Sequence, residues 1–255
     1  MIKFETASDT TSESPAGNPS GNPSAHSDVS VTGVTRSYVR LALFFLAVLS
    51  GYGYVLLWPW HPYPMSYALK ATPLVLIALA WWCGPRQTGM RRRDGVFYTV
   101  ALLFSAVGDV FLDLDRAGYL RQALLAFLVA QVAYICLFWP RRHITTVNRW
   151  FPLLLLAACG LLLRQFYANA GALWWPLVVY VFCLGWMALA AFWSRRWPLM
   201  AGGLLFLCAD ALIGINRFWL PFEHSTPVIV SLYISAQLLL AYGVLFGYLP
   251  DRRRR

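Results

Sequence analysis

The feature that most constrains this chain is a series of eight apolar stretches, most of them long enough to cross a lipid bilayer. A membrane-spanning helix needs about 17–25 predominantly apolar residues. Inside hydrocarbon every backbone polar group must find an internal partner, so such stretches form helices. We therefore predict an all-α, polytopic membrane protein with eight transmembrane helices. They lie near Tyr38–Trp58, Ser66–Cys83, Val96–Leu112, Gln122–Trp139, Trp150–Leu163 (which can extend to Tyr167), Ala172–Trp193, Leu199–Ile215 and Pro227–Tyr248.

The composition and the charge agree with a membrane protein. Hydrophobic residues make up 59% of the chain, against about 45–50% in soluble domains. Charged residues are only 13%. The net charge of +10 is explained by arginines that flank membrane helices, so we expect a lipid bilayer and no nucleic acid as partner.

The basic residues fall mainly on one side of the predicted bundle. Sixteen lie in the N-terminal tail, the even-numbered connections and the C-terminus, whereas the odd-numbered connections carry only Arg116, Arg121, Arg164 and Arg217. The positive-inside rule then places both termini in the cytoplasm, in a plasma or inner membrane. Residues 1–36 are rich in Ser, Thr, Gly, Asn and Pro, and we predict a disordered cytosolic tail there. Residues 37–249 form the membrane domain and 250–255 a basic cytosolic end.

Two carboxylates interrupt the apolar stretches in the same local frame. The same pattern, small–Asp–x–apolar–apolar–x–apolar–(Asp/Asn)–Arg, occurs twice, at Gly108-Asp109 through Arg116 and at Ala209-Asp210 through Arg217. A carboxylate near the centre of a bilayer costs roughly 2.5–3.5 kcal/mol on insertion scales, so two in one frame indicate a function. Each of these helices precedes one with an Ala-Gln pair, which suggests a four-plus-four internal repeat.

The orientation places the polar residues at similar depths in the outer half of the membrane. At a rise of 1.5 Å per residue, Lys70 lies about 6 Å, Asp109 about 5–6 Å and Asp210 about 8–9 Å below the outer boundary. Ser105, Asp109 and Asp113 share one helical face because they are spaced by four residues. We take Asp109, Asp210 and Lys70 as candidate catalytic residues. The candidate substrate-binding residues are Asn216, Arg217, Arg116, Gln237, Tyr233, Gln131 and Asp113.

Simpler explanations exist for several of these residues. Asp109 can be a structural partner of Lys70, since charges within the membrane tend to pair. Asp113 and Asp115 suit a solvated helix end, the glutamines suit contacts between helices, and Tyr233 suits packing. The histidines and cysteines show no metal-ligand or CxxC spacing, so the sequence predicts no metal and no cofactor.

Five motifs in a fixed order give the chain a family resemblance. They are Lys70-Ala-Thr-Pro73, Leu103-Phe-Ser-Ala-Val-Gly-Asp-Val-Phe-Leu112, Phe127-Leu-Val-Ala-Gln-Val-Ala-Tyr134, Ala209-Asp-Ala-Leu-Ile-Gly-Ile-Asn-Arg-Phe218 and Tyr233-Ile-Ser-Ala-Gln237. With them the chain resembles the YhhN-like membrane proteins, which include the animal lysoplasmalogenases. It departs from their pattern at two places. The family commonly has proline directly after the lysine, whereas here Pro73 comes three residues after Lys70. The family commonly has histidine at the position of Gln131.

The resemblance implies hydrolysis of the vinyl ether bond of a lysoplasmalogen, which releases a fatty aldehyde and a glycerophospho-ethanolamine or -choline. Enol ether hydrolysis passes through an oxocarbenium ion, as glycoside hydrolysis does with two carboxylates. Asp109 and Asp210 would then divide the acid and base roles, with Lys70 keeping one of them ionised. Arg116, Arg217 or Asn216 would hold the phosphate.

Two other functions fit the same polar residues. The chain could be a non-catalytic protein that binds or moves lysophospholipid or another ether lipid, or it could be a proton-coupled transporter. A site in the outer half favours the enzyme or the lipid binder, because transporters bind near the midplane. The sequence leaves the oligomeric state open.

Overall fold

The computed structural model describes residues 23–85, 90–145 and 149–247, and for residues 23–33 the backbone alone. In these ranges the chain forms eight α-helices and three 3-10 helices, and no strand. The short 3-10 helices are η1 (Trp58–Trp60), η2 (Trp139–Arg141) and η3 (Gly171–Leu173). The α-helices are α1 (Pro23–Leu56), α2 (Ser66–Cys83), α3 (Arg92–Leu114), α4 (Leu120–Phe138), α5 (Phe151–Ala170), α6 (Trp174–Phe192), α7 (Trp197–Phe218) and α8 (Ser225–Leu245).

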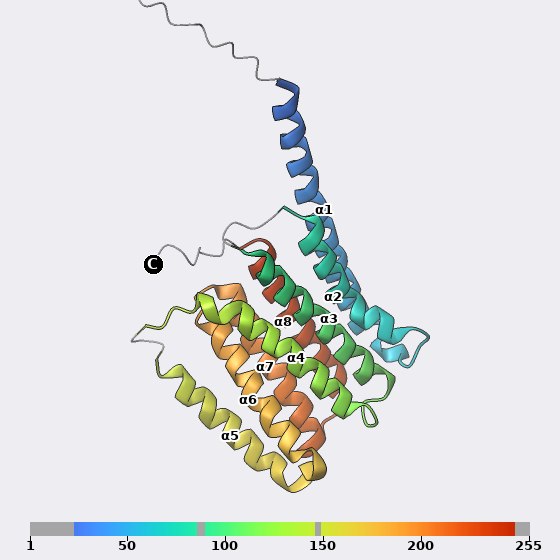
Figure 1. The fold of residues 1–255 in the computed structure, drawn as a ribbon. Coiled ribbons are helices and arrows are strands. Elements are labelled where there is room, and N and C mark those ends of the chain that lie inside the picture. Colours follow the sequence, from blue (N-terminus) through green and yellow to red (C-terminus); the bar gives the residue numbers. More distant parts are fainter. Residues whose placement is uncertain (1–22, 86–89, 146–148, 248–255) are drawn as a thin grey trace, which may run out of the picture.

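Seven stretches of the described helices are long and apolar enough to cross a membrane. One of them, Phe151–Phe192, has 42 residues and contains α5, η3 and α6. The chain reverses at Gly171, whose φ of +50° is a conformation that glycine adopts at little cost. Figure 1 shows α5 and α6 side by side as a hairpin. The structure is thus an all-helical bundle typical of a multi-pass membrane protein.

The helices pack mainly against their neighbours in sequence. The most extensive contacts join α3 to α4 and α7 to α8, and the contact of α4 with α6 links the two halves of the chain. Successive helices run in alternating directions, so α8 ends at the end of the bundle where α1 enters it (Figure 1). The first part of α1 projects beyond the bundle (Figure 1).

Small residues allow the helices of the second half to approach closely. A Cβ atom on Gly203 of α7 would lie 2.7 Å from the Ala191 side chain of α6, and one on Gly243 of α8 would lie 2.5 Å from Leu199 of α7. Such small-residue contacts bring membrane helices together where apolar surface alone gives no preference between lipid and protein. The interior also holds fully buried aromatic rings, among them Tyr134 and Phe206.

The helix limits agree with the prediction at α2 and differ at α1 and α5. Because α1 begins at Pro23, residues 23–36 are helical, and the disordered tail predicted for 1–36 is wrong there. Proline favours the first position of a helix, and the next helix-breaking residue is Gly33, so the polar composition does not prevent a helix. The α5 helix continues to Ala170, past Leu163 and three residues beyond the predicted extension to Tyr167. Residues 1–22 and 250–255 lie outside the described residues.

Candidate active site

The predicted polar face of α3 points into the bundle. Ser105 and Asp109 are buried, and the Asp113 side chain is only 2% exposed. Lys70 of α2 lies opposite, with its Nζ 3.8 Å from Asp109 Oδ1, and both side chains are less than 5% exposed. The expected proximity of Lys70 and Asp109 is therefore confirmed. A buried cation beside a carboxylate lowers the cost of both charges.

A hydrogen-bond network from α8 surrounds Asp109. Gln237 Nε2 donates to the hydroxyl oxygens of Ser105 and Tyr233 at 3.2 Å, and Gln237 Oε1 accepts from Tyr134 at 2.7 Å. The side chain of Gln237 thus holds α3, α4 and α8 together. The Tyr233 hydroxyl lies close to Asp109, outside good hydrogen-bond geometry. Asp109 Oδ2 is buried and accepts no hydrogen bond from the described residues.

Asp210 of α7 has a different environment. Its Oδ2 accepts a hydrogen bond of 2.5 Å from the Tyr180 hydroxyl of α6. Lys and Arg side chains of the described residues form no ion pair with it, in contrast to Asp109. The two carboxylates are nevertheless near enough to repel each other electrostatically. Asp210 is thus held by one phenol rather than by a cation.

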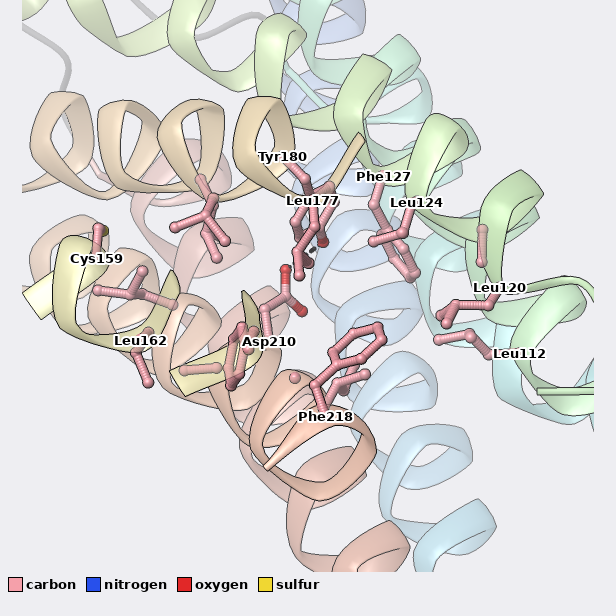
Figure 2. Close-up of a pocket in the computed structure, with 18 residues that line it drawn as sticks. Leu112, Leu120, Leu124, Phe127, Cys159, Leu162, Leu177, Tyr180, Asp210 and Phe218 are labelled. Atoms are coloured by element: carbon pink, nitrogen blue, oxygen red, sulfur yellow. Dashed lines mark hydrogen bonds between the residues drawn. The ribbon is translucent and has the colours of Figure 1, made fainter. Parts of the chain in front are cut away.

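Asp210 and Tyr180 face a narrow, mostly apolar pocket between α4, α5, α6 and α7. Figure 2 shows the Asp210 carboxyl group directed at Tyr180 in the middle of this pocket. Leu120 lies toward one end and Cys159 toward the other (Figure 2). The remaining lining is hydrocarbon except for the Cys159 thiol. We call this hollow, which has a volume of about 40 Å³, the Asp210 pocket; its lining is hydrocarbon with one carboxyl group beside it.

Gln131 of α4 lies behind this pair. Its side chain is fully buried, and neither its Oε1 nor its Nε2 has a hydrogen-bond partner among the described residues. An unsatisfied buried amide costs about 1–3 kcal/mol. The Tyr180 hydroxyl lies nearby. Gln131 does not line the Asp210 pocket.

A second hollow adjoins the Asp210 pocket where α3 and α7 end. Arg116, Asn216 and Arg217, the residues predicted to bind phosphate, line this mouth together. Leu120 and Ile213 line both hollows, so the mouth lies directly beside the Asp210 pocket.

The groups in the mouth are anchored in different ways. Arg116 donates to Thr226 Oγ1 at 2.9 Å, and Asn216 Oδ1 accepts from the Phe222 amide at 3.1 Å, whereas Arg217 is exposed. Burial lowers the pKa of the Arg116 guanidinium, although an arginine remains cationic at neutral pH. The mouth therefore presents positive charge at the entrance of an apolar pocket.

The suggestion that Asp113 is a solvated helix end is wrong. Its carboxylate accepts hydrogen bonds from the hydroxyls of Tyr54 and Ser66, and His61 Nε2 lies 3.6 Å away. Burial, together with the charge of Asp113, raises the pKa of Tyr63 in the same loop. Asp113 is buried because the α1–α2 connection folds over it, which its own helix cannot reveal. The neighbouring Asp115 is exposed and accepts from the amides of the following turn.

Several buried polar residues had no clear signal in the sequence. Tyr180 stands in an apolar stretch 30 positions before Asp210, and only the packing of α6 on α7 joins them. At the opposite end of the bundle, Arg141 Nη2 lies 2.6 Å from Asp94 Oδ2 in a second buried ion pair. The described ranges contain no group of three or more His, Cys, Asp or Glu side chains arranged to hold a metal.

Comparison with known proteins places this chain in a family. A sequence model described as the YhhN family matches residues 65–244. The chain belongs to the YhhN family. Lysoplasmalogenase TMEM86A of Bos taurus is 34% identical over 155 residues, which cover 56% of this chain and 62% of that protein. The protein of the same name from Homo sapiens is 34% identical over 169 residues, 61% of this chain and 68% of that protein.

A bacterial relative covers more of the chain. A lysoplasmalogenase of Mycobacterium bovis is 30% identical over 201 residues, 72% of each protein. The chain thus spans between about three fifths and three quarters of the length of these YhhN-type relatives. No solved structure matches the chain significantly.

Proposed function

We propose that this YhhN-family protein hydrolyses the vinyl ether bond of a lysoplasmalogen, as the names of its relatives indicate for them. One observation carries the proposal: the cationic mouth lies next to the apolar Asp210 pocket, since Leu120 and Ile213 line both hollows. A lysoplasmalogen has a phosphate head at one end, a vinyl ether near it, and a long hydrocarbon chain beyond. With its phosphate at Arg116 and Arg217, its chain enters the pocket that Asp210 faces.

The reaction requires a proton donor, a water molecule and stabilisation of a cation. A carboxyl group protonates the β-carbon of the vinyl ether, and the ether oxygen shares the resulting positive charge as an oxocarbenium ion. Water then adds to the charged carbon and loses a proton, and the hemiacetal collapses. The products are a fatty aldehyde and the glycerophospho-alcohol, whose oxygen takes up the proton. No redox cofactor takes part in this balance.

We assign the proton donor to Asp210 and the stabilising carboxylate to Asp109. Asp210 lines the pocket and has no cationic partner among the described residues, and an uncompensated charge in an apolar pocket is costly, so its protonated form is favoured. Asp109 has Lys70 beside it, and an adjacent cation favours the carboxylate. As in glycosidases, a neutral acid and an ionised carboxylate share an oxocarbenium-like reaction.

The other candidate residues take supporting parts in this proposal. Arg217, Arg116 and the Asn216 amide bind the phosphate in the mouth. Tyr180, with Gln131 nearby, orients Asp210 through its hydrogen bond, and Tyr233, held by Gln237, packs beside Asp109. Asp113 orders the α1–α2 connection through Tyr54 and Ser66, so it shapes the entrance without contact to the lipid.

We also propose the membrane topology predicted from the sequence, with eight spans, cytoplasmic termini in a plasma or inner membrane, and a four-plus-four repeat. The alternating helix directions in Figure 1 support it, as do the equally extensive α3–α4 and α7–α8 contacts. Cysteines introduced at exposed Ala117 and Arg195, on opposite ends of the bundle, test the orientation. An impermeant maleimide should label Ala117→Cys in intact cells and Arg195→Cys only after lysis, above the background of the parent protein. The opposite pattern would invert the topology.

The function is tested by aldehyde release from pure lysoplasmalogen by the purified protein in detergent. We expect turnover that depends on enzyme concentration and is lost in both Asp109→Asn and Asp210→Asn. A saturated lysophospholipid with the same head group is the matched control, because it binds without a cleavable bond. Binding of both lipids without aldehyde release would favour a lipid-binding protein. Proton flux coupled to lipid uptake in proteoliposomes would favour a transporter.

A further inference from the structure

A hollow lined by arginines lies at the end of the bundle where α3 begins, opposite to the mouth. It has a volume of about 330 Å³ and lies between α1, the end of α2 and the start of α3. We call it the arginine hollow; its lining includes Arg36, Trp81, Trp82, Gly84, Arg91 and Arg92. We propose that it binds the phosphate of an anionic phospholipid, whose acyl chains lie along the lipid-facing side of α2. The inference is independent of the proposed activity.

The three arginines bring positive charge from two helices to one place. Arg36 belongs to α1, Arg91 directly precedes α3 and Arg92 begins it. All three are exposed and form no ion pair within the described ranges. Among the described residues no aspartate or glutamate lines the hollow. A guanidinium group binds phosphate oxygens through two parallel hydrogen bonds, so an anion in the hollow would relieve the mutual repulsion of these cations.

The carboxylate that follows these arginines in the sequence is already occupied. Asp94 is buried, and its Oδ2 accepts from Arg141 Nη2 at 2.6 Å and from the Arg91 backbone amide at 2.9 Å. Its Oδ1 lies 4.0 Å from Arg93 Nε. The side chains that neutralise Asp94 thus lie outside the lining of the hollow, and the lining arginines keep their charge for another anion.

A buried arginine behind the wall adds to the positive charge. Arg40 of α1 is 4% exposed, and its Nη1 and Nη2 donate to the carbonyl oxygens of Leu245 and Pro85. Its Nε is buried without a hydrogen-bond partner, and it forms no ion pair with a carboxylate of the described residues. The guanidinium lies against Gly84, where a Cβ atom would overlap it. An anion in the hollow would offset part of the cost of this buried charge.

Apolar surface beside the hollow favours a lipid over a free anion. Leu79 and Trp82 are three residues apart on one face of α2 and are 46% and 53% exposed. Trp82 Nε1 donates to Thr99 Oγ1 of α3 at 2.9 Å, which fixes the indole ring beside the hollow. Tryptophan is typical of the boundary between head groups and hydrocarbon. In the proposed topology this end faces the cytoplasm, the side on which anionic lipids attract basic segments.

The test compares two lipids with the same acyl chains. Purified protein in detergent is titrated with phosphatidylglycerol or phosphatidylcholine, and native mass spectrometry gives the bound fraction. We expect phosphatidylglycerol to bind more tightly, because its head group has no cation to offset the phosphate. The double variant Arg91→Gln with Arg92→Gln should lose about thirtyfold in affinity for phosphatidylglycerol, the effect of two arginines near an anionic lipid. Equal binding of the two lipids by the wild type would overturn the proposal.

Control variants separate a site from a general effect of charge. Arg142→Gln with Arg149→Gln removes the same charge from exposed residues at the same end of the bundle that do not line the hollow. It should leave the affinity within about twofold, and a loss equal to that of the double variant would overturn the proposal. Arg36→Gln tests the same hollow from α1 and should weaken binding about fivefold, so the test survives if the α3 variant does not fold. Loss of binding in Arg217→Gln instead would place the lipid in the mouth.

A soluble phosphate compound distinguishes the two sources of the anion. Glycerol 3-phosphate has a phosphate and no acyl chain, so it lacks the contact with Leu79 and Trp82. We expect it to leave bound phosphatidylglycerol in place at micromolar concentration. Displacement of the lipid at that concentration would assign the hollow to a free phosphate compound and overturn the lipid site.

Discussion

Asp109 and Asp210 occupy the same place in two similar motifs and have opposite surroundings. Asp109 has Lys70 at 3.8 Å and lies beside the hydrogen-bond network of Gln237. Asp210 has one hydrogen bond, from Tyr180, and otherwise faces an apolar pocket. An ion pair favours the charged form of a carboxyl group, whereas an apolar pocket favours the neutral form. Two copies of one sequence motif can therefore supply a neutral acid and a carboxylate, because different helices pack against each copy.

The largest expected effect is that of Asp210→Asn. Asparagine keeps the shape of the side chain and can still accept from Tyr180, but it carries no acidic proton. General acid catalysis contributes typically 10²–10⁴-fold, so we expect aldehyde release to fall by about 10³-fold. The thermal unfolding temperature in detergent should stay close to that of the wild type, because no buried ion pair is broken. Activity within tenfold of the wild type would remove Asp210 from the acid role.

Asp109→Asn should reduce both activity and stability. We expect a loss of about 10²-fold in kcat, since the oxocarbenium ion loses the carboxylate that stabilises it. Lys70 is left as an unpaired buried charge, and breaking such a pair costs about 3–5 kcal/mol. The double variant Lys70→Met with Asp109→Asn should recover most of the unfolding free energy and none of the activity. Recovery of activity in the double variant would make the pair purely structural.

Asp94 provides the control for a structural aspartate in the same helix. Its ion pair with Arg141 is buried at the other end of the bundle, far along α3 from Asp109. Asp94→Asn should lower the unfolding free energy by about 3–5 kcal/mol and leave kcat per folded molecule unchanged. If Asp94→Asn lowers kcat as much as Asp109→Asn does, loss of activity in α3 variants reports instability alone.

Tyr180→Phe should have a smaller effect on activity, which acts through Asp210 and not through Asp109. It removes the 2.5 Å hydrogen bond to Asp210, and a hydrogen bond between neutral groups is worth about 0.5–1.5 kcal/mol. We expect kcat to fall roughly twofold to tenfold with little change in KM. Tyr134→Phe, which breaks a bond to Gln237 on the Asp109 side, is the matched tyrosine variant. An equal change in KM and kcat for Tyr180→Phe would indicate a role in substrate binding.

The smallest predicted effect concerns the mouth that serves both carboxylates. Arg217 is exposed and makes no ion pair among the described residues, so Arg217→Gln should not destabilise the protein. Losing one contact between a guanidinium and a phosphate should raise KM several-fold and leave kcat nearly unchanged. Kinetics with lysoplasmalogen in mixed micelles measure both constants. A fall in kcat with KM unchanged would place Arg217 in the chemical step.

The sequence alone predicted the helical bundle and the contacts that depend on local spacing. Hydropathy gave α2 its observed limits, and helical spacing placed Ser105, Asp109 and Asp113 on one face because those relations are local. The Lys70–Asp109 pair could also be predicted, because the orientation of the helices in the membrane gives both residues a similar depth.

Other contacts depend on how distant helices pack. The Tyr180–Asp210 hydrogen bond, the α1–α2 connection over Asp113 and the Asp94–Arg141 pair each join helices whose relative rotation no local pattern encodes. The helical start at Pro23 was missed for a different reason. Composition averages over a segment and ignores that these residues directly precede the apolar part of α1, from which a helix that is already nucleated can extend back to Pro23.

In the proposed mechanism Asp210 delivers a proton to carbon while Asp109 remains a carboxylate. Hydrolysis in D₂O, with the aldehyde reduced at once by borohydride, measures this delivery. We expect one deuterium on the carbon next to the former aldehyde in the wild type, and a rate of this transfer about 10³-fold lower in Asp210→Asn. Aldehyde without deuterium at that carbon, or transfer at the wild-type rate in Asp210→Asn, would rule the mechanism out.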